Sequence, residues 1–158
     1  MSWRTYILSQ ALGTAGFNAL CNAALAAFLW HGESTLSYDA IGVDLATTPI
    51  WIGLLTVLLG TPFIRKALAD GRMLREAGIR PHAALYHLPR NVLLRDAVAA
   101  GLCGLFFALP LSLVLPLLGD GILTGAEAIG SKVIITLAFS LLIVPLVVYA
   151  TTKDVRAI

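Results

Sequence analysis

Charged residues are scarce in this chain. Only 13% of its 158 residues are charged and 58% are hydrophobic, whereas a typical soluble domain carries roughly 25% charged residues. The mean hydropathy is +0.86. Because too few polar side chains exist to cover a water-facing surface, the composition excludes an ordinary soluble domain. The length fits one domain.

Cysteine and histidine are also few. Cys21 and Cys103 lie inside apolar runs with no CxxC pair, which is typical of small buried hydrophobic residues rather than of redox partners. His31, His82 and His87 lie outside the apolar runs. His82 and His87 are five positions apart, a spacing at which two histidines on a helix are poorly placed to bind one metal ion. We therefore expect no metal, no haem and no other cofactor.

The motifs of known chemistry are missing. The sequence has no zinc motif, no glycine-rich phosphate loop and no nucleophile paired with a base. A membrane enzyme that forms disulfides needs CxxC, and a small multidrug exporter needs a glutamate in its first span; neither is present. We expect a protein that is not an enzyme.

Long apolar runs are what the chain has in abundance. A membrane-spanning helix needs about 20 mostly apolar residues. Four runs without a charged residue qualify, at about 6–30, 48–64, 97–118 and 133–150. Lipid forces the backbone to bond internally, so we predict an all-α integral membrane four-helix bundle in one domain, 1–158. The first run is too long and too polar for a cleaved signal peptide, so we expect it to be retained.

Proline and threonine mark the expected ends of these helices. Thr48-Pro49 predicts an N-cap and first residue for the second helix. Pro110 and Pro116 are expected to bend the outer half of the third helix. Leu88-Pro89-Arg90-Asn91 is typical of an entry into the helix that leads to the third span.

Basic residues lie almost entirely on one side of the predicted spans. The connection 65–96 carries seven and the termini carry three more, whereas the loop 31–47 carries none. Because positive loops stay inside, we predict cytoplasmic termini, in a bacterial inner membrane. Anionic lipids attract such residues. The candidate headgroup contacts are Arg65, Lys66, Arg72, Arg75, Arg90 and Arg95. Their spread among apolar residues argues against nucleic acid as a partner.

The two halves of the chain resemble each other weakly. Asp39-Ala40-Ile41-Gly42 is echoed by Glu127-Ala128-Ile129-Gly130, and Leu58 to Pro62 by Leu141 to Pro145. The two echoes differ by five residues in offset, and matches this short also arise by chance. If the repeat is real, the bundle consists of two helical hairpins of the same orientation, related by an axis along the membrane normal.

The first span carries a polar stripe. Gln10, Thr14, Asn18 and Asn22 follow one another at intervals of four, which places neighbours on one helix face. Polar side chains are costly against hydrocarbon, so the stripe should face protein or water. Three interpretations remain open: hydrogen-bonded packing between helices, the lining of a path for a solute or ligand, and contact with a cofactor.

Lys132 is the one basic residue on the predicted outer side. Its long side chain can extend to the membrane interface. It can instead pair with Glu127, Asp44 or Asp120, or bind an anion or couple protons. We treat Lys132, Glu127 and Asp44 as a candidate charged outer site.

Two classes of function fit these features. The first is a non-catalytic auxiliary subunit of a membrane complex, or a self-associating bundle, whose partner is another membrane protein or a second copy. The second is a small oligomeric transporter or channel that uses the polar stripe. The sequence favours the first, because it shows surfaces for helix packing and no chemistry.

Overall fold

The computed structural model describes residues 3–70, 89, 91–114, 117 and 122–155, and it contains four spans. The first, second and fourth are the single helices α1 (Trp3–Leu29), α2 (Tyr38–Ala69) and α5 (Gly125–Val155). The third consists of α3 (Val92–Cys103), the π-helical turn η2 (Gly104–Ala108) and α4 (Leu109–Val114). All four are long and apolar enough to cross a membrane, which confirms the predicted all-α membrane bundle.

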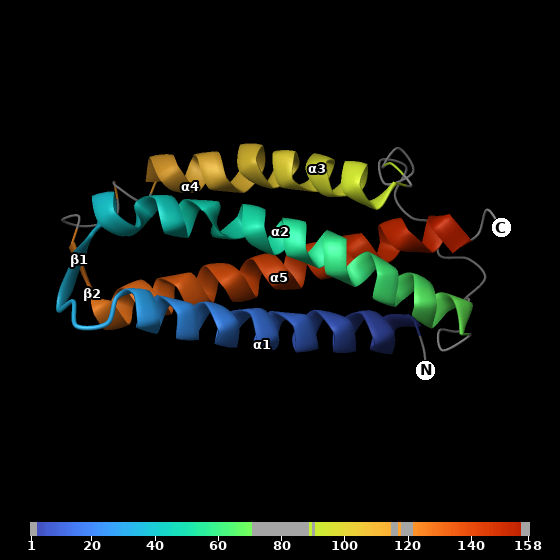
Figure 1. Ribbon diagram of the computed structural model, residues 1–158, viewed down its shortest axis with the longest axis horizontal. Helices are drawn as coiled ribbons and strands as arrows, with labels where there is room; N and C mark the ends of the chain where they lie inside the picture. The colour runs from blue at the N-terminus through green and yellow to red at the C-terminus, as the bar shows by residue number, and fades with distance from the viewer. Residues whose placement is uncertain (1–2, 71–88, 90, 115–116, 118–121, 156–158) are drawn as a thin grey trace.

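The four spans lie side by side in a row, in the order α1, α5, α2 and third span (Figure 1). α5 packs against α1 and α2, and α2 packs against α5 and the third span. Among the described residues, α1 therefore has its extended contact with α5 rather than with α2, its neighbour in sequence. The two spans of each expected hairpin do not form the main contact with each other. Instead, the first span of each half packs against the long helix of the other half.

A pair of short strands joins the two halves at one end of the bundle, and both termini lie at the other end (Figure 1). We call these the strand end and the terminal end. β1 (Thr35–Ser37) and β2 (Ile122–Thr124) pair antiparallel, with Leu36 opposite Leu123 at the centre. Each strand leads directly into a long helix. Both halves thus have the same order of elements and the same direction, as the weak repeat predicted.

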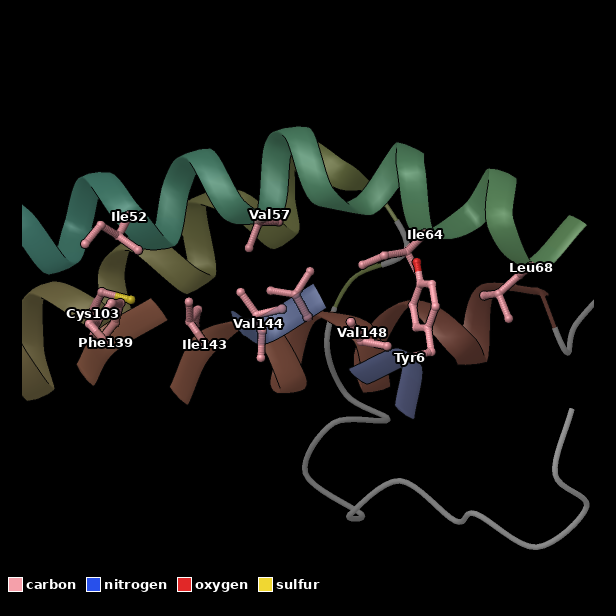
Figure 2. Close-up of a cluster of buried hydrophobic side chains, with 12 residues drawn as sticks. Tyr6, Ile52, Val57, Ile64, Leu68, Cys103, Phe139, Ile143, Val144 and Val148 are labelled. Atoms are coloured by element: carbon pink, nitrogen blue, oxygen red, sulfur yellow. The ribbon is translucent and has the colours of Figure 1, made fainter. Parts of the chain in front are cut away.

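The main apolar core lies between α2 and α5 (Figure 2). Ile52, Val57 and Ile64 of α2 meet valine, isoleucine and phenylalanine side chains of α5, and Tyr6 of α1 and Cys103 of α3 close its margins. Large side chains on the outer faces of all four spans are exposed. An apolar exterior of this kind is the surface that lipid requires.

The predicted start of the second helix is wrong. α2 begins at Tyr38, with Ser37 as its N-cap, and Pro49 lies inside it. A proline removes the hydrogen bond to the carbonyl four residues earlier, which for Pro49 is that of Leu45. The two threonines before it bond other carbonyls of the same turn: Thr47 Oγ1 donates to the Val43 carbonyl at 2.8 Å and Thr48 Oγ1 to the Asp44 carbonyl at 2.7 Å. Thr47 and Thr48 therefore satisfy their own hydroxyls inside the helix, and α2 continues through Pro49 with one backbone hydrogen bond fewer.

The third span is entered at the predicted residue, Asn91, and its π-helical turn precedes the proline that was expected to bend its outer half. Asn91 caps α3, and its side chain accepts from the backbone N–H groups of Leu93 and Leu94 at 2.9 and 3.3 Å. The π-helical turn η2 ends two residues before Pro110. A wider turn relieves the missing donor and the clash that proline brings to a helix. Pro116 lies outside the described residues.

Candidate functional site

The polar stripe of α1 winds from an open groove into a helix contact. Gln10 is exposed, whereas Thr14, Asn18 and Asn22 are half-buried. Asn18 Nδ2 donates to Ser140 Oγ of α5 at 3.0 Å, and Asn22 Nδ2 donates to the Asn18 carbonyl at 3.0 Å. A spacing of four drifts slowly around a helix of 3.6 residues per turn, so Asn18 reaches α5, whereas Gln10 stays exposed.

A half-open groove of about 430 Å³ runs between α1 and α2 above α5. Gln10, Thr14 and Asn18 line its α1 wall. Thr56 and Gly60 line its α2 wall, and valines of α5 form its floor. The groove exists because the extended contact of α1 is with α5, which leaves a gap along α2.

Four polar side chains that line this groove, Ser9 among them, make no hydrogen bond to the described part of the chain. The other three are Gln10, Thr14 and Thr56, and Thr56 is only 8% exposed. In a membrane such groups meet hydrocarbon, and an unpaired amide or hydroxyl there costs several kcal/mol. The groove therefore favours an occupant that supplies hydrogen-bonding groups.

The structure selects one of the pairings considered for Lys132. Its ammonium forms an ion pair with Asp44 of α2 and lies 5.5 Å from the ring centroid of Trp30. Lys132 is 2% exposed, so its side chain does not extend to the membrane interface. The pair ties the two long helices together near the strand end, and the indole face adds a cation–π contact. Asp120 lies outside the described residues.

Glu127 does not join this charged site. Its Oε2 accepts from the Thr124 backbone N–H and Oγ1, both at 2.8 Å, and the Glu127 N–H donates back to Thr124 Oγ1 at 3.3 Å. This reciprocal arrangement is a capping box. It explains why α5 begins at Gly125, eight residues before the predicted start of the fourth span at about 133. The candidate outer site therefore reduces to Lys132 and Asp44, with Trp30.

A buried polar ladder continues from this ion pair along α5. Lys132, Thr136 and Ser140 are spaced by four and are all buried. Ser140 accepts from Asn18, whereas Thr136 Oγ1 has no partner within the described residues. Polar side chains thus extend along α5 from the strand end to Asn18 at the groove. Among them, the Thr136 hydroxyl is unsatisfied in the described part of the chain.

Sequence reasoning missed a second buried charged cluster near the terminal end. Arg95 is 1% exposed; its Nε donates to the Pro89 carbonyl at 2.9 Å and its Nη1 to Thr151 Oγ1 at 3.3 Å. The neighbouring Asp96 is 7% exposed, and its Oδ1 has no partner within the described residues. The predicted third span began at 97 and left both charges out. The available signal was the apolar run Val92-Leu93-Leu94, which already belongs to α3.

Arg95 is therefore wrong as a lipid-headgroup contact, because protein atoms surround it. Of the other candidates, Arg65 is half-buried and makes an interaction within the protein, and Lys66 is exposed in the last turn of α2. Arg72, Arg75 and Arg90 lie outside the described residues. Headgroup binding stays a prediction for all of these except Arg95.

The described part of the chain contains no cluster of three or more His, Cys, Asp or Glu side chains that could hold a metal ion. Comparisons with protein-family models, curated proteins and solved structures find no match. The fold and its contacts define the class: the chain is an integral membrane four-helix bundle.

Proposed function

We propose that this protein is a non-catalytic membrane subunit that binds a transmembrane helix in the groove between α1 and α2. The observation that carries the proposal is the set of polar side chains in that groove without a partner among the described residues, Ser9, Gln10, Thr14 and Thr56. A helix that offers hydrogen-bonding groups would satisfy them and fill the gap along α5. Interhelical hydrogen bonds of this type contribute about 0.6 kcal/mol each on average.

The basic residues support an orientation for the subunit. In it the terminal end, with Arg65 and Lys66 near the end of α2, faces the cytoplasm, and the strand end faces outward. A bacterial inner membrane fits this arrangement. Lys66 is exposed and stands where anionic headgroups would meet it.

The experiment is a purification of the tagged protein in mild detergent, with identification of the chains that migrate with it. Wild type should migrate as an oligomer or with another membrane protein. Gln10→Leu with Thr14→Val should release the partner while helical content stays unchanged. Ser112→Ala, which removes an exposed hydroxyl on α4 that bonds the Leu109 carbonyl, is the matched control. Migration of wild type as a lone monomer would contradict the proposal.

A second candidate function is transport of a small solute, and the polar ladder of α5 favours it. The unsatisfied Thr136 hydroxyl lies one helical turn from both Lys132 and Ser140. A passing solute or water molecule would supply its missing hydrogen-bond partner. Here Thr136→Val and Asn18→Leu should abolish flux through reconstituted vesicles. Equal flux in wild type and both variants would exclude this function.

A further inference from the structure

An exposed seam runs along α1, and its first three residues line the groove. It consists of residues separated alternately by four and three positions: Gln10, Thr14, Phe17, Cys21, Ala24 and Phe28. All of them are exposed except Thr14, which is half-buried. Alternation of four and three is the spacing by which two helices pack in a left-handed pair, and most membrane bundles cross in this way.

The chemistry of the seam restricts the partner. No charged residue occurs from Thr5 to Leu29, so the seam offers a charged partner nothing to pair with. The Gln10 amide and the Thr14 hydroxyl each both donate and accept hydrogen bonds. Such groups pair well with copies of themselves, provided that the copies lie at the same depth in the membrane.

A second copy of this chain meets that condition through symmetry. We propose, on the basis of the helix-docking function above, that a second copy occupies the groove, with the α1 helices of the two copies packed in parallel along this seam. An axis along the membrane normal then brings each seam residue opposite its own equivalent. The Gln10 amides pair with each other across the axis, and the Thr14 hydroxyls do the same.

The groove has room for this approach. Gly13 lies on its α1 wall and Gly60 on its α2 wall. A Cβ atom added at Gly13 would meet nothing within 4 Å, and one at Gly60 would meet only ordinary contacts at 4.0 Å. Small residues at such places let helix backbones approach closely in a membrane.

Cys21 provides a direct test, because the seam places the two copies of Cys21 opposite each other. Membranes containing the wild-type protein are oxidised with copper phenanthroline, and disulfide-linked dimer is measured on a non-reducing gel. Cys103 is 3% exposed and stays silent, so Cys21→Ser should abolish the dimer. Leu20→Cys in the Cys21→Ser background is the matched control, since it is exposed at the same depth but lies about 100° around the helix.

The expected result is rapid cross-linking through Cys21 and at least about tenfold less through Leu20→Cys. Gln10→Leu with Thr14→Val should lower dimer formation about tenfold, as expected for the loss of about two interhelical hydrogen bonds. Absence of a Cys21 dimer, or equal cross-linking at both positions, would overturn the second copy as partner. If wild type then still purifies with a different chain that Gln10→Leu with Thr14→Val releases, the docking function stands; if it purifies alone, both proposals fail.

Discussion

Lys132 and Asp44 show how a single pair of side chains can join the two halves of a membrane protein. An ammonium group removed from water is costly, and a charge inside a membrane span is retained mainly where it has a partner or a function. Here Asp44 and the Trp30 ring surround the ammonium. The exposure is unequal, with the Lys132 side chain at 2% and that of Asp44 at 39%.

This inequality predicts an asymmetric response to mutation. Asp44→Asn leaves a buried charge without its partner and should lower the free energy of unfolding by about 3 kcal/mol. Lys132→Met leaves a carboxylate that is partly accessible, so its effect should be smaller. The measurement is unfolding in mixed micelles with increasing sodium dodecyl sulfate.

Lys132→Met combined with Asp44→Leu should recover much of the lost stability, because no charge is then left unpaired. Glu33→Gln, an exposed change near the same end of the bundle, serves as the control. Equal losses for the two single variants would show that the ion pair does not hold Lys132 in place.

At the scale of the elements, α2 shows what the sequence could and could not predict. Its apolar stretch and its role as a span followed from composition, and Asn91 was a sound signal for the start of α3. The predicted start of α2 was wrong, because the sequence Thr-Pro is compatible with two structures. It can be an N-cap followed by the first helical residue, or it can lie inside a helix with the threonine hydroxyl bonded to a backbone carbonyl. Ser37 became the cap because the pairing of β1 with β2 fixes the chain there, and a contact across 87 residues has no local signature.

The contact between α2 and α3 depends on a glycine. A Cβ atom added at Gly53 would lie 2.7 Å from the Cys103 sulfur, closer than packed atoms can lie. Gly53→Ala should therefore push the two spans apart and lower the free energy of unfolding by about 1–3 kcal/mol. Thermal unfolding in detergent measures the effect.

Two further variants test whether this contact is the cause. Cys103→Ala should rescue Gly53→Ala, because it removes the sulfur that clashes. Gly42→Ala in the same helix, where an added Cβ meets nothing within 4 Å, should be neutral or stabilising by helix propensity. A loss of stability at Gly42 equal to that at Gly53 would attribute the effect to the helix backbone instead.

At the scale of the whole molecule, the exchange of first spans between halves creates the groove. α1 packs on α5 and the third span packs on α2, so each outer span has one main neighbour. The polar stripe indicated that one face of α1 should meet protein or water, and the bond of Asn18 to Ser140 supplies a protein contact for part of it. Which helix would meet the stripe could not be predicted, because helix order in a bundle depends on long-range packing that periodicity does not encode.

The proposed orientation can be checked on the whole protein. A fluorescent reporter that matures only in the cytoplasm should be active when fused after Ile158, and alkaline phosphatase should be inactive there. Insertion of alkaline phosphatase after Glu33, at the strand end, should give the opposite result. Active phosphatase at the C-terminus would reverse the orientation and remove the basic residues from the cytoplasmic side.

The proposed function requires that the groove between α1 and α2 receives a transmembrane helix. A photo-reactive amino acid at Phe63, which lines the groove and is exposed, tests it most directly in intact membranes. The same residue at Leu105, exposed on η2, reports an ordinary lipid-facing position. If a helix occupies the groove, the reactive group at Phe63 should cross-link to polypeptide and the one at Leu105 to lipid alone. Cross-links to lipid alone from both positions would contradict the proposed function.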